Sequence, residues 1–251
     1  MRFRVLGSVT AVPQTPTAPK VRSVLAVLVT RANQPVSALT LASELWGDTP
    51  PRTAASALQV YISQLRRTLT EDGSRPLSTD LCGYRLHVAP DDLDLTVFEA
   101  LSREGCRAVE RGEYAFGAEL LRSALDLWSG PALSGVRHGP VLARAAECMQ
   151  DLRLTALDHR ITADLRLGRH AELTGELMAL TQQFPRYEPF HAHLMMALFR
   201  SYRRADAVKA YVRVCGTLDD EGVQPGVELR ALHRRILTCD PVLTWREPAR
   251  L

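Results

Sequence analysis

One segment of the chain carries polar side chains at a spacing that suits contact with a polyanion. Apolar residues recur along 53–69 at three- and four-residue intervals, which predicts a helix with one buried stripe. No carboxylate occurs between Arg52 and Leu69. Amides and guanidinium groups bind base edges and phosphates, whereas phosphate repels carboxylates, so this face suits a helix in the major groove of DNA. The face consists of Ser56, Gln59, Val60, Ser63, Gln64, Arg66 and Arg67.

Two shorter helices are predicted before this long one. Apolar residues at helical spacing predict the first over 21–32. Ser37 is a suitable N-cap for the second, whose mostly inward stripe begins with Leu39. That helix ends at 47–51, where one glycine and two prolines break the pattern. The three helices therefore follow one another with short connections.

Short strands are predicted on both sides of the helices. Alternating segments at 2–6 and 8–12 open the chain, and a hairpin that turns at Gly83 follows the long helix. Helix, helix, polar-faced helix and hairpin is the order of a winged helix-turn-helix, with Arg85 near the wing. A small packed domain without any role in nucleic-acid binding has the same periodicity, so this alternative stays open.

Charge is distributed unevenly over the 251 residues. Residues 1–90 contain 10 basic and 5 acidic side chains, whereas residues 91–251 contain 21 and 23. A basic first third suggests that this part faces a polyanion. The longest apolar run, Val24–Val29, is far shorter than the roughly 20 residues of a membrane helix, and polar residues near the N-terminus lead us to expect no secretory signal. We therefore expect a cytoplasmic, nucleoid-associated protein with no membrane partner.

Cysteine and histidine give no sign of a metal site. The five cysteines include no CxxC pair, so we expect them to be reduced and to form neither a zinc site nor a disulfide framework. His191 and His193 lie two residues apart and are interpreted as imidazoles on a helix surface. No metal or other cofactor is therefore expected.

The remainder of the chain reads as helix. The chain contains an internal repeat: the segment Leu167–Leu173 resembles Ser201–Ala207, which lies 34 residues later, the period of tetratricopeptide repeats. The segment Arg111–Phe116 likewise combines a basic residue, a small residue and the start of a helix. Stacked helix pairs of this kind leave a concave surface for protein segments or dimer formation, while a plain helical bundle is the alternative. The expected helices lie near 94–111, 114–128, 139–167, 170–183, 187–200, 204–219 and 226–238.

The first part of the chain resembles the DNA-binding domain of the Streptomyces antibiotic regulatory protein family. The motifs are Leu45-Trp46-Gly47, the run from Tyr61 to Arg67, and Gly83-Tyr84-Arg85-Leu86. The resemblance implies the winged helix of OmpR-type response regulators. It also implies that the long helix enters the major groove and that the hairpin residues Gly83, Tyr84 and Arg85 reach the minor groove. The loop after the second helix would face RNA polymerase through Trp46, Gly47, Asp48, Thr49 and Pro50.

The second part resembles the bacterial transcriptional activator domain of the same family. The segments Ala124–Gly130, Leu194–Arg200 and Gln224–Leu229 carry this likeness. Tyr202 departs from it by standing where relatives usually have glycine, and Cys215 stands where arginine is common. The expected organisation is the short two-domain form, with a winged-helix DNA-binding domain at 1–92 and a tetratricopeptide-like helical domain at 93–251.

The function expected from these features is sequence-specific activation of transcription. The chain contains no Walker A run, no dinucleotide-binding glycine pattern and no GxSxG, so no catalytic residue is assigned and an enzyme is not expected. The expected partners are double-stranded promoter DNA with direct repeats, RNA polymerase holoenzyme through its sigma factor, and a second copy of the chain. Arg52 and Thr53 at the start of the long helix are assigned to phosphate. The alternative is a helical-repeat adaptor that does not bind DNA.

Overall fold

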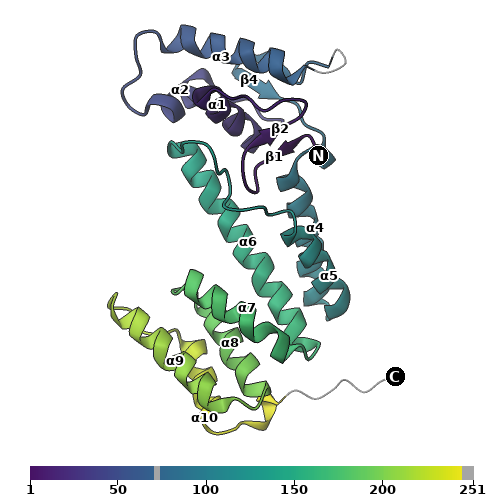
Figure 1. The fold of residues 1–251 in the computed structure, drawn as a ribbon, viewed down its shortest axis with the longest axis vertical. Helices are drawn as coiled ribbons and strands as arrows, with labels where there is room; N and C mark the ends of the chain where they lie inside the picture. Colours follow the sequence, from purple (N-terminus) through teal and green to yellow (C-terminus); the bar gives the residue numbers. More distant parts are fainter. Residues whose placement is uncertain (71–73, 245–251) are drawn as a thin grey trace. The chain divides into compact units, whose positions relative to one another are not determined.

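The computed structural model describes residues 1–70 and 74–244. The chain divides into two compact units. The first contains residues 1–103 and 122–155, and the second contains residues 104–121 and the chain from 156 onward. Most of the described residues are helical, and the strands form two small two-stranded sheets (Figure 1). The mainly α-helical fold class expected from the sequence is confirmed.

Three helices and a hairpin form the predicted winged helix in the first unit (Figure 1). Ser37 caps α2 as expected, because its hydroxyl accepts a hydrogen bond of 3.0 Å from the Thr40 amide. The stripe of α3 from Leu58 to Leu69 is buried, and α3 packs on α1 and α2. The elements are α1 (Pro19–Thr30), α2 (Ala38–Trp46), α3 (Ala54–Leu69), β3 (Leu77–Asp80) and β4 (Gly83–Leu86).

The opening strands are shorter than the sequence suggests. β1 (Phe3–Arg4) and β2 (Thr10–Ala11) pair antiparallel, but neither strand extends over the full alternating segment. The residues between them bind a distant part of the chain instead. The Leu133 amide donates to the Val5 carbonyl at 2.8 Å, and the Val9 amide donates to the Ser134 carbonyl at 3.2 Å. The expectation of two five-residue strands was therefore wrong, because Leu133 and Ser134 form hydrogen bonds with Val5 and Val9 in the middle of the alternating region.

Gly83 does not form the turn of the hairpin. Leu81 and Cys82 form it, and Gly83 is the first residue of β4. Its φ is +139°, and a Cβ atom there would lie 2.1 Å from the carbonyl oxygen of Val36. The Val36 and Tyr84 backbones exchange hydrogen bonds of 2.8 and 2.9 Å at this point. The glycine is thus required by a close backbone approach rather than by the turn.

Seven helices follow the hairpin within the described residues. Each begins and ends within three residues of its expected bounds, so the apolar periodicity predicted them correctly. A short 3₁₀ turn, η1 (Pro90–Asp92), precedes them and another, η2 (Pro241–Leu243), comes after them. The helices are α4 (Asp94–Glu110), α5 (Tyr114–Leu125), α6 (Pro140–Arg166), α7 (His170–Gln183), α8 (Glu188–Arg200), α9 (Arg204–Asp219) and α10 (Val227–Leu237).

The internal repeat in the sequence corresponds to a turn that ends a helix and recurs three times. Gly112, Gly168 and Tyr202 follow the ends of α4, α6 and α8 with φ values of +83°, +84° and +61°. In each turn the next amide donates to the carbonyl five residues earlier, as the Arg203 amide does to Leu198 at 2.9 Å. This is the hydrogen bond of a Schellman motif, which favours glycine in the left-handed conformation. Tyr202 occupies that position without being a glycine.

Replacing Tyr202 by glycine is expected to stabilise the protein by about 0.5 kcal/mol. The change relieves roughly 1 kcal/mol of left-handed strain, partly offset by the greater freedom of glycine in the unfolded chain. The tyrosine side chain is 99% exposed, so little packing is lost. Urea unfolding of the two proteins measures the difference.

Ser201→Gly is the matched control for this substitution. Ser201 has a φ of −89°, so glycine relieves no strain there and is expected to destabilise. If both variants lose stability, Tyr202 is not strained in the folded protein.

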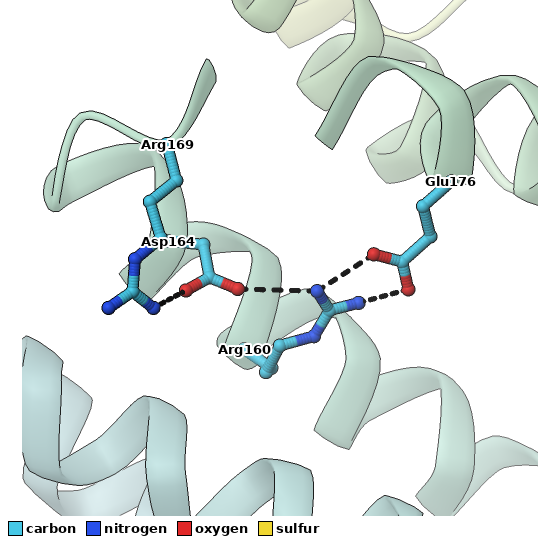
Figure 2. A network of polar contacts seen from close by, with 4 residues as sticks. All are labelled: Arg160, Asp164, Arg169 and Glu176. Carbon is cyan, nitrogen blue, oxygen red and sulfur yellow. Dashed lines mark hydrogen bonds and ion pairs between the residues drawn. The ribbon is translucent and has the colours of Figure 1, made fainter. Parts of the chain in front are cut away.

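A buried ionic network joins α6 to α7 in the second unit. Figure 2 shows Arg160 between two carboxylates, with Asp164 on its own helix and Glu176 on α7. The Arg160 guanidinium lies 3.2 Å from Asp164 and donates to both oxygens of Glu176, and Arg169 donates to Asp164 at 2.7 Å (Figure 2). Because Arg160 and Asp164 are almost fully buried, removal of either partner leaves an uncompensated charge. The network therefore fixes how the two helices pack.

His191 is not on the helix surface as expected. It is buried in α8, and its Nε2 lies 2.9 Å from the carbonyl oxygen of Pro185. Burial lowers the pKa of His191 below the usual value of 6.5. His193 is half-buried and lies 2.7 Å from Asp158 of α6. Both imidazoles thus serve helix packing.

Candidate nucleic-acid interface

The polar face of α3 is presented to solvent along its whole length. Its buried stripe faces α1 and α2, so the opposite side chains project outward. Gln64 is half-buried, and Val60 is 60% exposed in the middle of the face. Val60 therefore contributes little to the core. The exposed residues are Arg52, Thr53, Ser56, Gln59, Val60, Ser63, Arg66 and Arg67.

The two arginines at the end of α3 differ in their surroundings. The Arg66 guanidinium donates to the Leu77 carbonyl at 3.3 Å and to the Thr79 hydroxyl, so it ties the helix to the hairpin. Arg67 is exposed in the last turn, where a cation also complements the helix dipole. Arg66 is therefore held in place by the fold, which limits the directions in which it can reach a ligand.

The predicted hairpin contacts are largely engaged within the protein. Arg85 forms an ion pair with Asp80 across the hairpin, and its other terminal nitrogen lies 3.5 Å from the Asn33 carbonyl. The hydrogen bond from Arg85 lowers the pKa of Asp80 below its usual 3.8. Tyr84 is half-buried, with its backbone bonded to Val36. Arg85 must leave Asp80, at least in part, to bind a phosphate.

All seven residues of the loop between α2 and α3, 47–53, are exposed. Gly47 ends α2 with a φ of +60°, and a Cβ atom there would meet nothing within 4 Å. Asp48, Thr49 and Pro50 are exposed with it, while Trp46 is half-buried beneath the Lys20 ammonium, 5.1 Å from the ring centre. The loop thus offers a small polar surface directly before the polar-faced helix.

Glu44 of α2 caps the start of α6, and sequence reasoning missed it. Its buried carboxylate accepts hydrogen bonds from the Gly139, Val141 and Leu142 amides at 2.6, 2.8 and 3.2 Å. These are amides at the start of α6, which no residue of that helix can satisfy. The signal in the sequence was a single carboxylate beside Leu41 and Leu45 on the apolar side of α2.

Asp94 performs a similar task at the start of α4. Its buried carboxylate accepts hydrogen bonds from the Val5 and Leu6 amides at 2.9 and 3.1 Å, and from Leu95 at 2.8 Å. Burial raises the pKa of Asp94, although these amides oppose the shift. Asp94 therefore ties the backbone of Val5 and Leu6 to the start of α4.

Several classes of site are not found in the described part of the chain. Within the described residues, 1–70 and 74–244, no group of three or more histidine, cysteine or acidic side chains is placed to hold a metal ion. The same residues contain no helix with the length and apolarity needed to cross a membrane. All five cysteines are free.

Two family models match the chain. The model of the bacterial transcriptional activator domain covers residues 93–237, and that of the C-terminal domain of transcriptional regulatory proteins covers residues 14–86. The second range contains α1, α2, α3 and the hairpin, and the first contains α4 to α10.

Relatives and a solved structure match over most of the chain. Regulatory protein DnrI of Streptomyces peucetius is 40% identical over 99% of this chain and 96% of its own. Transcriptional regulator RedD of Streptomyces coelicolor is 38% identical, over 91% of this chain and 68% of its own. The structure of Mycobacterium tuberculosis EmbR in complex with a low-affinity phosphopeptide superposes with a TM-score of 0.90 at 34% identity. That match covers 95% of this chain and 65% of EmbR.

The two family models, the order of the elements and these relatives agree on one class of protein. The chain is a transcriptional regulator of the activator type, not an enzyme. It belongs to the Streptomyces antibiotic regulatory protein family, with an OmpR-type winged helix followed by a bacterial transcriptional activator domain.

Proposed function

We propose that the protein activates transcription by placing α3 in the major groove of promoter DNA. The observation that carries this proposal is the exposed face of α3, which has no carboxylate from Arg52 to Leu69 and is rich in amide and guanidinium groups. An α-helix fits the major groove, where each base pair presents a distinct pattern of donors and acceptors. The regulator family of the chain supports the same reading.

The side chains of α3 divide between base edges and phosphates. Gln59, Ser63 and Gln64 are assigned to base edges, where a bidentate amide contact discriminates by about 1–3 kcal/mol. Val60 is suited to the methyl group of thymine, because it is apolar and exposed. Arg52, Thr53 and Ser56 lie at the start of the helix, where phosphate is favoured. Arg66 already donates to the hairpin, so we assign Arg67 to a phosphate or a guanine and Arg66 chiefly to holding the hairpin. The hairpin residues Gly83, Tyr84 and Arg85 remain the proposed minor-groove contact.

Two copies of the protein are proposed to bind direct repeats in the promoter. Half-sites on one side of the duplex lie about 10–10.5 base pairs apart or a multiple of that distance. The helical part supplies the surface for the second copy, and genes for a secondary metabolite are the proposed target. Footprinting on the promoters beside the protein's own gene identifies the repeats.

Salt dependence tests the proposed DNA contact. The affinity for a promoter duplex is expected to fall steeply with salt, with a slope of about −0.9 per phosphate contacted in a plot of log K against log[salt]. Fluorescence anisotropy of a labelled duplex at several salt concentrations measures this slope. Absence of binding even at low salt would favour the adaptor function and contradict the proposal.

The loop from Trp46 to Pro50 is proposed to bind RNA polymerase through its sigma factor. Asp48→Ala combined with Thr49→Ala is expected to reduce transcription severalfold while it leaves DNA affinity unchanged. Both side chains are exposed, so the fold should tolerate the changes. Reconstituted transcription and anisotropy on the same promoter separate the two effects.

Asp91→Ala is the control for the loop variant, because Asp91 is exposed but lies outside the loop. Full transcription by the double variant would rule out a contact through these two residues.

A further inference from the structure

The hairpin of the first unit ends in an exposed leucine. Leu81 and Cys82 form its two-residue turn, between the paired residues Asp80 and Gly83. Leu81 is fully exposed, more than any other large apolar residue in the described part of the chain. Because two-residue turns favour asparagine and glycine, turn formation does not explain a leucine at this position. Its apolar surface stays in water unless another molecule covers it.

The strands behind this tip are fixed to the rest of the domain. The Val36 and Tyr84 backbones exchange hydrogen bonds of 2.8 and 2.9 Å, and Gly83 lies directly against the Val36 backbone. The Arg66 guanidinium donates to the Leu77 carbonyl at 3.3 Å. The hairpin is thus tied both to α3 and to the segment before α2, so it provides a firm support for a side chain at its tip.

Polar side chains along the two strands are already engaged within the protein. Three pairs are formed: Ser78 with His87 at 2.9 Å, Thr79 with Arg66, and Asp80 with Arg85. The last pair lies directly behind the turn, where Arg85 balances a carboxylate that would otherwise repel phosphate. The tip therefore offers a partner chiefly apolar contact rather than hydrogen bonds to base edges.

We propose that Leu81 enters the minor groove of promoter DNA as a wedge between two neighbouring base pairs and kinks the duplex. This inference rests on the proposed function, which places the hairpin at the minor groove. Proteins that insert an apolar side chain there unstack a base step and bend the duplex by about 20–90° toward the major groove. The separated base pairs cover the leucine, which is exposed in the free protein.

The wedge gives the protein a sequence preference that does not depend on hydrogen bonds. Pyrimidine–purine steps, which are TA and CA/TG, unstack and kink easily, whereas A-tracts are stiff. The promoter position beneath the hairpin is therefore expected to contain a pyrimidine–purine step.

Bending of a labelled promoter duplex tests the wedge. Energy transfer between dyes at the two ends of the duplex is expected to show a bend of about 20–90° when the full chain is saturating. Leu81→Asn replaces the leucine by a polar side chain of similar shape, and asparagine is favoured in turns, so the hairpin should fold. We expect this variant to lose most of the bend at saturation. A bend equal to that of the original protein would overturn the proposal.

Two control variants isolate the apolar character of the tip. Leu81→Met keeps an apolar side chain and should retain the bend. Leu237→Asn makes the same change at an exposed leucine of α10, outside the proposed DNA contact, and should leave the bend unaltered. Loss of the bend in Leu81→Met, or equal losses in the two asparagine variants, would contradict the proposal.

Changes in the DNA locate the wedge independently of the variants' stability. Each pyrimidine–purine step of the footprint is replaced in turn by an AA step, and affinities are measured by anisotropy. At one position the original protein is expected to bind about tenfold more weakly, and Leu81→Asn to lose much less. Equal losses in the two proteins at every position would contradict an insertion by Leu81.

Failure of this inference is distinguishable from failure of the proposed function. A chain that does not bind the promoter duplex even at low salt overturns both. A chain that binds the duplex with the expected salt dependence but leaves it straight overturns only the wedge.

Discussion

Replacing Glu44 by alanine is expected to lower the free energy of unfolding by about 3 kcal/mol. The substitution leaves three amides at the start of α6, those of Gly139, Val141 and Leu142, without the carboxylate that now satisfies them. Because Glu44 is only 7% exposed, water has little access to replace it. Urea unfolding followed by circular dichroism measures the loss.

Two comparisons isolate the cause of this loss. Glu44→Gln keeps one acceptor oxygen but brings an amide donor against backbone donors, so an intermediate loss is expected. Glu147→Ala removes an exposed glutamate of α6 itself and should change stability by less than about 0.5 kcal/mol. A Glu44→Ala protein as stable as the Glu147→Ala protein would mean that the carboxylate does not cap α6.

Replacing Gln59 by glutamate is expected to weaken promoter binding by about 100-fold. The change preserves the shape of an exposed side chain, so the fold should not be affected. It removes an amide donor from the base-reading face and places a carboxylate where the face has none. Anisotropy titrations with the promoter duplex at fixed salt measure the effect.

Gln183→Glu is the matched control for this variant. It makes the same chemical change at an exposed position of α7 and alters the net charge equally. Any general effect of added negative charge appears in both proteins, and only a local effect separates them. Should the two variants bind DNA equally well, α3 would not be the helix in the groove.

Local patterns predicted the helices because each helix is stabilised along its own apolar stripe. The stripe of α3 from Leu58 to Leu69 is buried as its spacing predicts. The same reasoning failed at Leu39, which the periodicity placed inward but which is 80% exposed. Leu39 lies in the first turn of α2, where no neighbouring element covers it. The periodicity of one helix does not show how far the element packed against it extends.

Contacts between distant residues were not predictable from one sequence. The ion pair of Arg85 with Asp80 depends on the hairpin register, which a turn at Gly83 would have changed. The residue types of the candidate site were visible, because the face of α3 lacks acids. Which of its arginines is already engaged was not visible, since Arg66 meets Thr79 only after the hairpin folds back on α3.

The hydrogen bonds of Val5 and Val9, which lie between the opening strands, with Leu133 and Ser134 have a consequence for synthesis of the protein. A ribosome that adds roughly 5–20 residues each second delivers these two partners many seconds after Val5 and Val9. Until then the carbonyl of Val5 and the amide of Val9 lack their native partners. A nascent chain that already contains α3 therefore lacks these native contacts of Val5 and Val9. They can form only after the segment that follows α5 has been synthesised.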